Sequence, residues 1–306
     1  MVTRVSCQHW LRNHSFEVKS GSYQVAIFQK GLQFMSKSFA EVFQVSNPKT
    51  FKLSDCDPRD KCGLEDKDKV KAKTAEDAAR IDELQNCLYA EGKRTLLVIL
   101  QGIDCSGKDG TVRAVLNTCG PIGVQIASFK APTAEELSHD YLWRIHKVVP
   151  PKGYIGVFNR SHYEDVLVVK VKGYASPEAI EKRYDEINQF EKQLTQNGVT
   201  VLKFMLNISK DEQAVRLKER IEDPAKRWKF NPDDLEDRKR WDEFMAAYDI
   251  ALKRCSTDHV PWHVIPADRN WVRNYVIGRI VREKLEEMNP QFPEAKGWDP
   301  KTVVIQ

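Results

Sequence analysis

Residues 96–111, LLVILQGIDCSGKDGT, have the types and spacing of a phosphate-binding loop between a strand and a helix. Gly102 and Gly107 allow backbone N–H groups to turn toward phosphate oxygens, and Gly110 belongs to the same predicted phosphate-binding set. Lys108 can reach a phosphoryl group during transfer, and the N-terminal end of the following helix adds a partial positive charge. The segment therefore predicts a site for phosphate chemistry, with Lys108 as a catalytic residue.

The acidic residues of this segment change the expected metal site. In the usual loop of this type a Ser or Thr follows the lysine and holds Mg²⁺, but this chain has Asp109 there. Asp104, inside the loop, is a hard oxygen donor, and we assign it to the metal and to catalysis. Asp109 is predicted to act on the same ligand. The alternative is a strand, turn and helix without a ligand, but the buried-strand pattern at 96–100 favours the phosphate site.

A second cluster follows the third expected strand, in the segment FNRSHYED. Such sheets bind ligands at the carboxyl ends of their parallel strands. The planar, permanently charged guanidinium of Arg160 suits phosphoryl oxygens, so we predict a catalytic role, with a structural salt bridge to Asp104 or Glu164 as the alternative. An acid normally helps to hold Mg²⁺ at this position, which here is Asn159. The predicted metal ligands are therefore Asp104, Asn159 and Glu164.

Lysines and arginines gather between Arg216 and Arg240, where Asp223-Pro224 and Asn231-Pro232 interrupt the helical pattern. This spacing predicts a helix, a loop and a helix, with cations on the connecting segment. For any single lysine a solvated surface position is the alternative. Together with Arg160, the cations predicted to bind a polyanion are Lys130, Arg220, Lys226 and Lys229.

Hydrophobic spacing and cap residues define the elements that must position these side chains. Strands are expected near 96–100, 124–129, 154–158, 200–206 and 262–265, and helices near 66–89, 111–116, 134–146, 177–198, 210–222, 233–254 and 270–288. Strands that alternate with helices predict an α/β fold, a P-loop kinase-like doubly wound parallel sheet of about five strands flanked by helices. The basic segment forms a helical lid over 209–240.

The chain has 306 residues and is 41% hydrophobic, with a formal net charge of +4. We expect a single catalytic domain over 51–306 and a poorly ordered extension over 1–50, with an edge strand at 23–28 as the alternative for part of it. Seven cysteines without a C-x-x-C pair predict neither a disulfide framework nor a zinc site. The apolar runs are too short to cross a membrane, and we expect a cytoplasmic location.

Several independent segments resemble the polyphosphate kinase 2 family in order and spacing over about residues 50–295. They are GIDCSGKDG, SFKAPTAEELSHDYLWR, GVFNRSHYEDVLVVKV, DPAKRWKF with WDEFMAAYDIAL, and PWHVIPADRNWVRN. The resemblance implies a phosphotransferase that moves the terminal phosphoryl group of inorganic polyphosphate to a nucleotide, reversibly, with Mg²⁺, or with Mn²⁺ in its place. It also implies that Lys108 and Asp104 act on phosphates and metal, and that the basic lid closes over them. Asn159, where many members have Asp, resembles the third subgroup, which is associated with phosphorylation of both AMP and ADP.

The expected partners are inorganic polyphosphate and adenine nucleotides, with guanine nucleotides as a further acceptor class. We also expect a homo-oligomer, and neither a nucleic-acid nor a membrane partner. For the acceptor base, the stacking candidates are Tyr141, Trp143, Tyr163 and Trp228, each with core or rim packing as the alternative.

Two other functions fit parts of the pattern. An ATP-dependent nucleoside monophosphate kinase would differ in its phosphoryl donor. A non-catalytic nucleic-acid-binding module would use the basic segment, but that segment lacks the interleaved aromatic residues of single-strand binders.

Overall fold

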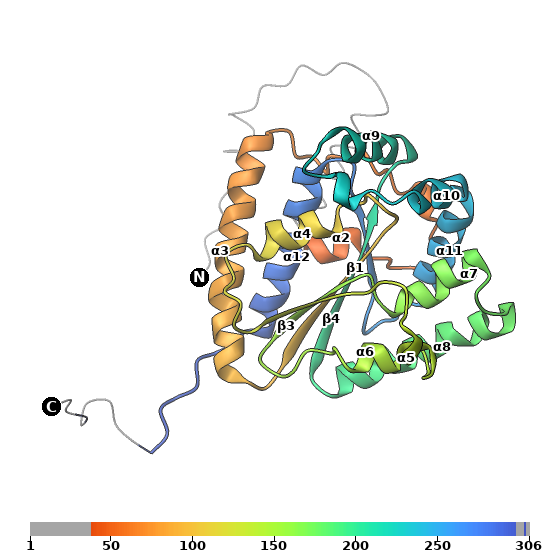
Figure 1. Ribbon diagram of the computed structural model, residues 1–306. Helices are drawn as coiled ribbons and strands as arrows, with labels where there is room; N and C mark the ends of the chain where they lie inside the picture. Colours follow the sequence, from red (N-terminus) through yellow and green to blue (C-terminus); the bar gives the residue numbers. More distant parts are fainter. Residues whose placement is uncertain (1–37, 298–302, 304–306) are drawn as a thin grey trace. The chain divides into compact units, whose positions relative to one another are not determined.

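A computed structural model describes residues 38–297 and residue 303 of the chain (Figure 1). Its core is one five-stranded sheet in which every strand pair is parallel, in the order β2-β3-β1-β4-β5. The strands are β1 (Thr95–Gln101), β2 (Val124–Ser128), β3 (Ile155–Asn159), β4 (Val199–Asn207) and β5 (Trp262–Pro266). The predicted doubly wound α/β fold and the five predicted strands are confirmed.

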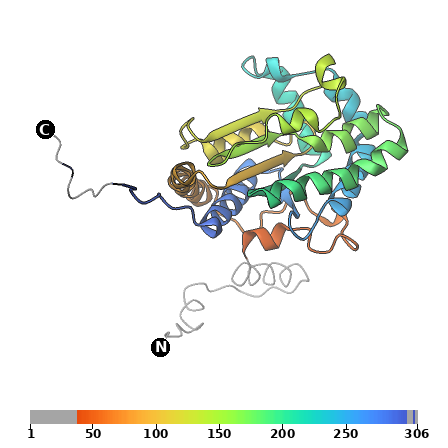
Figure 2. The same ribbon diagram turned by 90° about the horizontal axis from the view of Figure 1, so that it is seen from below.

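Helices cover both faces of this sheet. The α-helices that follow residue 66 in the described part of the chain are α3 (Lys67–Glu91), α4 (Lys108–Leu116), α5 (Ala134–Leu137), α6 (Trp143–His146), α7 (Val168–Lys172), α8 (Pro177–Gln196), α9 (Lys210–Glu222), α10 (Asp233–Lys239), α11 (Trp241–Arg254) and α12 (Asn270–Met288). In Figure 1, α3 and α12 lie on one side of β1, while α8 and α11 lie on the other, and Figure 2 shows the same layers from below.

Alternate residues of the central strand β1 belong to the hydrophobic cores on the two opposite faces of the sheet. Leu97 and Ile99 pack with α8 through Phe190 and Leu194. Val98 and Leu100 face α4 and α12 on the opposite side. Since all seven residues of β1 are buried, the strand has a continuous apolar pattern, as expected for a strand covered on both faces.

The connections of neighbouring strands leave the sheet on opposite faces. The chain passes from β1 into α4 on one face, whereas β3 is followed by α7 and α8 on the other. In open α/β sheets, ligands bind in the crevice outside the carboxyl ends of strands where this reversal occurs. The topology therefore assigns the site to the residues that follow β1 and β3.

Most helix ends agree with their sequence signals. Asp66 caps α3 by accepting from Lys69 N, and α3 ends at Gly92, whose φ of +62° is left-handed. Ser176 caps α8 by accepting from Ala179 N.

Two predicted helices are each divided in the structure. The helix expected over 134–146 is replaced by α5 and α6, because Asp140 accepts from Leu142 N and Ser138 donates to a carbonyl of the preceding turn. Short polar side chains compete in this way with helical hydrogen bonds. The helix expected over 233–254 is interrupted at Arg240, where the chain leaves the lid and Trp241 enters the core.

Three short 3₁₀ segments complete the structure, namely η1 (Leu53–Asp55), η2 (His162–Val166) and η3 (Arg227–Lys229). Neither η2 nor α7 was predicted. Among the described residues, no helix is both long and apolar enough to cross a membrane.

The predicted extension over 1–50 lies partly outside the described residues, and the alternative edge strand at 23–28 lies entirely outside them. Residues 38–50 are described and contain the helix α2 (Phe39–Phe43), which packs against α12 and β5. Val45 N donates to Trp262 O at 2.8 Å, so this part of the segment is attached to the edge of the sheet.

Candidate functional site

The loop after β1 requires glycine at both ends. Gly102 has a φ of +155°, and a Cβ there would come within 2.7 Å of Ser106 Oγ and 2.8 Å of Leu206 O. Gly107 has a left-handed φ of +98°, and a Cβ there would overlap the guanidinium of Arg273. The loop is therefore a tight turn, pressed between β4 and α12, that leads into the N-terminus of α4.

Lys108, the first residue of α4, points back over this turn. Its side chain is buried, and Nζ donates to Gly102 O at 2.7 Å and to Ile103 O at 3.4 Å. Burial, reinforced by the positive charge of Arg160, lowers the pKa of this ammonium group. The lysine is thus held at the loop, with carbonyl oxygens as its partners.

Two arginines that the sequence reasoning missed bind the carbonyl groups of the loop. Arg216 of α9 donates through Nη1 to Cys105 O at 2.9 Å, and Arg273 of α12 donates through Nη1 to Ser106 O at 3.0 Å. Arg273 shares the buried helix face of Ile277 and Val281. A positive charge on the apolar stripe of α12 is the signal that could have revealed it.

Asp104 and Arg160 form the central ion pair of the site. Arg160 follows β3, its N donates to Leu100 O, and its Nη2 lies 2.5 Å from Asp104 Oδ1. Burial raises the pKa of Asp104, but the positive charges of Arg160 and Lys108 outweigh it and hold the pKa below the usual value. Asp104 is therefore ionised at neutral pH. The sheet brings these predicted residues together because β1 and β3 are neighbours in register.

A chain of contacts joins the lid, α9 to α10, to the loop. Asn159 Nδ2 donates to Asp109 Oδ1 at 2.7 Å, and Lys229 Nζ donates to Asp109 Oδ2 at 2.9 Å. Burial opposes ionisation of Asp109, but the hydrogen bonds from Lys229 and Asn159 keep its pKa below the usual value. Lys229, Asp109 and Asn159, all predicted for the site, are thus in direct contact.

The lid places a further charged pair beside Asp104. Arg220 Nη1 lies 3.0 Å from Asp234 Oδ2. Burial, together with the negative charge of Asp104, raises the pKa of Asp234 to about 6. Gln213 Nε2 donates to the backbone oxygen of Asp104 at 3.2 Å, so α9 contacts the loop directly. Arg220 was predicted for the site, whereas Asp234 was not.

The predicted metal ligands offer oxygen donors of the kind that Mg²⁺ prefers. Glu164 of η2 accepts from Gln101 Nε2 through Oε1 at 3.1 Å. Its other oxygen, and Oδ2 of Asp104, accept no hydrogen bond from the described residues. Within that part of the chain, no three His, Cys, Asp or Glu side chains converge as a preformed metal site. Mg²⁺ commonly needs only one or two protein carboxylates, with water and phosphate oxygens as its other ligands.

A buried polar network supports the segment that carries Glu164. Lys203 Nζ of β4 lies 2.6 Å from Glu191 Oε2 of α8 and donates to Tyr163 OH at 2.8 Å and to Cys255 O at 2.7 Å. Tyr163 in turn donates to Glu191 Oε1 at 2.8 Å. Tyr163 is fully buried, so the core-packing alternative holds for this stacking candidate. The network fixes η2 immediately after Arg160.

The remaining predicted side chains lie at the periphery or outside this cluster. Lys130 is exposed shortly after β2, and Lys226 pairs with Glu219 and Asp223 on the lid itself. Gly110 lies in the first turn of α4, where a Cβ would come within 3.3 Å of Arg273 Nη2. Burial raises the pKa of Cys105 to about 11, so this thiol is neutral at physiological pH.

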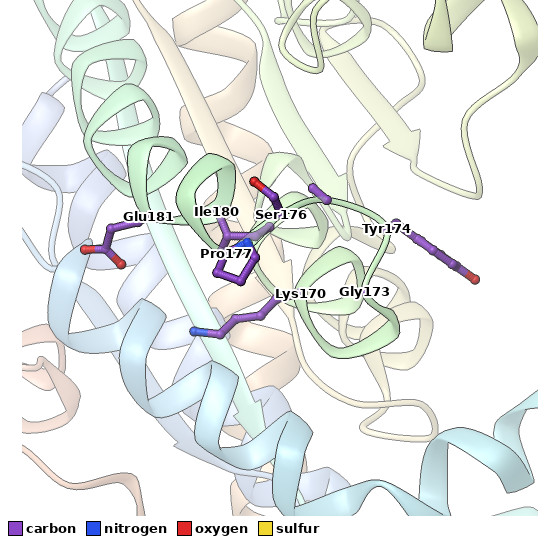
Figure 3. A pocket seen from close by; sticks show the side chains of 8 residues that line it. Lys170, Gly173, Tyr174, Ser176, Pro177, Ile180 and Glu181 are labelled. Atoms are coloured by element: carbon purple, nitrogen blue, oxygen red, sulfur yellow. The ribbon is translucent and has the colours of Figure 1, made fainter.

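A hollow of about 730 Å³ lies elsewhere, at the turn between α7 and α8 (Figure 3). Lys170, Tyr174 and Glu181 are among its lining residues, all of which belong to α7, to α8 or to the turn between them. It is therefore a feature separate from the phosphate loop.

Comparison with known proteins gives a consistent set of relatives. Residues 64–293 match the family described as Polyphosphate kinase 2 (PPK2). The chain is 50% identical over 225 residues to an AMP/ADP-polyphosphate phosphotransferase of Meiothermus ruber, which covers 74% of this chain and 84% of that protein. It is 41% identical over 227 residues to an ADP-polyphosphate phosphotransferase of Rhodopseudomonas palustris, which covers 70% of this chain and 78% of that protein. The crystal structure of polyphosphate kinase 2 from Arthrobacter aurescens TC1 superposes with a TM-score of 0.83 at 45% identity, over 87% of this chain and 95% of that one.

Proposed function

Because the chain belongs to the polyphosphate kinase 2 family, we propose that it transfers the terminal phosphoryl group of inorganic polyphosphate to AMP and ADP, reversibly and with Mg²⁺. The observation that carries the proposal is the convergence of four cationic side chains on one glycine-rich loop with a carboxylate inside it. Lys108, Arg160, Arg220 and Lys229 all lie within the network of contacts around Asp104 and Asp109.

The proposed reaction exchanges one phosphorus–oxygen bond for another. The bond from the terminal phosphorus of the polymer to its bridging oxygen breaks, and an oxygen of the acceptor phosphate bonds to that phosphorus. The acceptor oxygen is already ionised at neutral pH, so no strong base is needed. Lys108 and Arg160 stabilise the charge that spreads over the transferred group, while the loop amides orient it. Catalysis by this chain is therefore positioning and electrostatic stabilisation.

Asp104 and Glu164, with the amide oxygen of Asn159, have the donor chemistry to hold Mg²⁺. Bound there, the ion would neutralise phosphate charge and orient the reacting oxygens. The ion pair with Arg160 keeps Asp104 ionised, which is the form that a metal requires. Mn²⁺ is the expected substitute.

The lid suits a donor that has no base to recognise. Polyphosphate is a flexible polyanion, so a row of cations is a chemically sufficient receptor. Arg220 and Lys229 lie close to the loop. Lys226 is further out on the lid, beside its partners Glu219 and Asp223, and Lys130 is exposed just after β2. The exposed Trp228 is the remaining stacking candidate on the lid.

The deciding experiment varies the donor. The purified chain is incubated with Mg²⁺, long-chain polyphosphate and either AMP or ADP, and the nucleotides are separated by chromatography. We expect ADP and ATP to form only when polyphosphate is present. Turnover of ATP with a monophosphate, without any use of polyphosphate, would instead identify an ATP-dependent nucleoside monophosphate kinase. Lys108→Ala should be inactive, and Lys182→Ala, at an exposed position of α8, serves as the control.

The finer expectations stay predictions of this proposal. Parallel reactions with GMP and GDP test the guanine acceptors, and light scattering of the purified chain tests the homo-oligomer. A single catalytic domain over 51–306, a cytoplasmic location and the absence of a nucleic-acid partner belong to the same proposal.

A further inference from the structure

Arg273 is a buried arginine whose partners are all uncharged. Its side chain is only 2% exposed, and it donates to Ser106 O, to Asn270 Oδ1 at 2.7 Å and to Asn274 Oδ1 at 2.9 Å. Within the described residues, no carboxylate forms an ion pair with it. Buried charges are normally paired, because an isolated one loses its hydration without compensation.

Other arginines of the same helix follow the normal rule. Arg279 and Arg282 lie 3.0 Å and 2.9 Å from the two oxygens of the buried Asp77. The helix α12 thus carries two arginines with a carboxylate partner and one, next to the phosphate loop, without one. The contrast within one helix suggests that the partner of Arg273 is not a residue of the fold.

The guanidinium lies directly against the loop. A Cβ at Gly107 would overlap it, and one at Gly110 would lie 3.3 Å from Nη2. Burial, reinforced by the positive charge of Arg216, lowers the pKa of Arg273 to about 9. An anion near the loop would relieve this unfavourable charge.

The hydrogen bond to Ser106 O also acts on the phosphate side of the loop. Ser106 C=O and Gly107 N–H belong to one peptide group, so a cation on the carbonyl makes the N–H a stronger donor. Arg216 binds Cys105 O, but the Ser106 N–H of that peptide group donates to Ile103 O at 3.1 Å. The Gly107 N–H, by contrast, makes no hydrogen bond within the described residues, so Arg273 is the arginine that acts on an amide left for phosphate.

We propose that Arg273 is a positioning residue whose charge is balanced by the bound phosphate chain, across the Ser106–Gly107 peptide group. The inference rests on the proposed function, since it assigns the missing counter-charge to the polyphosphate donor. Under this proposal Arg273 helps to determine the affinity for polyanions, although it contacts the carbonyl side of the loop and not the bound phosphate itself.

The sharpest test supplies the missing carboxylate within the protein. Asn274→Asp replaces an amide oxygen that already accepts from Arg273 Nε at 3.2 Å and from Nη2. We expect the melting temperature of the protein without ligand to rise and the Kd for sodium tripolyphosphate to increase roughly tenfold, the size of one charge-assisted interaction. A purely structural role of Arg273 would not raise the melting temperature and weaken tripolyphosphate binding at the same time.

Isothermal titration calorimetry at fixed ionic strength measures the binding. Asn289→Asp adds the same charge at the exposed far end of α12 and should leave Kd unchanged. Unchanged affinity in Asn274→Asp, or an equal loss in both variants, would overturn the proposal. In a second comparison, Arg273→Gln should weaken tripolyphosphate binding, whereas Arg279→Gln should lower only stability. If Arg273→Gln does not fold, the Kd of Asn274→Asp for tripolyphosphate, compared with that of Asn289→Asp, decides whether the proposal holds.

Turnover of the wild-type chain separates this inference from the proposed function. If wild-type protein makes no ATP from polyphosphate and ADP, the function is wrong, whatever the variants bind. If it does so, and Asn274→Asp binds tripolyphosphate like the wild type, only the role of Arg273 fails.

Discussion

Lys203→Met should destabilise the protein strongly, because it leaves a buried carboxylate without its cation. Lys203 and Glu191 are both fully buried, and their charged atoms lie 2.6 Å apart. Removing one partner of such a pair typically lowers the free energy of unfolding by about 3–5 kcal/mol. At about 2–4 °C per kcal/mol for a domain of this size, the melting temperature should fall by about 6–20 °C.

The double variant Lys203→Met/Glu191→Met tests whether the loss comes from the uncompensated charge. Both charges are then absent, so the double variant should be more stable than Lys203→Met alone. Lys253→Met is the matched control, since Lys253 pairs with Asp249 at a partly exposed position on α11 and should cost at most about 1 kcal/mol. Thermal and urea unfolding followed by circular dichroism measure all four proteins. A double variant that is no more stable than Lys203→Met alone would refute this account of the network.

Four further predictions concern the site and its support. Lys108→Ala and Asp104→Asn should each remove most turnover in a coupled ATP assay while their circular dichroism spectra match the wild type; rates near wild type would contradict the site assignment. Lys229→Ala should raise the KM for polyphosphate yet change stability by at most about 1 kcal/mol, because its pair with Asp109 is partly exposed; an unchanged KM would remove it from the donor site. Added NaCl should raise the KM for polyphosphate more than that for ADP, because many screened contacts hold the polymer; equal effects would argue against a row of cations. Burial lowers the pKa of His263 from 6.5 to about 4, so the unfolded chain binds a proton near pH 6.5 that the folded chain does not bind until about pH 4. The contribution of His263 to stability should therefore fall by up to about 3 kcal/mol as the pH drops through this window, and the difference in urea stability between the wild type and His263→Asn should show that slope.

The predictable part of the site is the part encoded in short segments. Asp104 and Lys108 share one loop, and Arg160 follows a strand whose apolar run is plain in the sequence. Their meeting depends on the parallel pairing of β1 with β3. The alternation of strands and helices predicts a parallel sheet with a site at its carboxyl edge, but not which two strands are neighbours.

The parts that escaped prediction depend on contacts between distant segments. Arg273 meets Ser106 only after α12 has packed beside α4, and Lys203 meets Glu191 only across the interface of β4 and α8. The division between α10 and α11 at Arg240 was not predicted for a similar reason. The spacing of apolar residues alone does not reveal where the chain passes from the lid to the core.

The two ends of the lid are attached with very different strength, and this has a mechanical consequence. At its base, Arg216 donates to the backbone oxygens of Cys105, Ala267 and Asp268, and Ser209 is bound twice by the Asp268 carboxylate. At its tip, Lys229 forms the one ion pair with the loop found among the described residues, and its partner Asp109 is more than half exposed. The base of the lid is therefore held more firmly than its tip. Under the proposed function, Lys229 can separate from Asp109 and admit a long polymer while α9 stays bound to the phosphate loop.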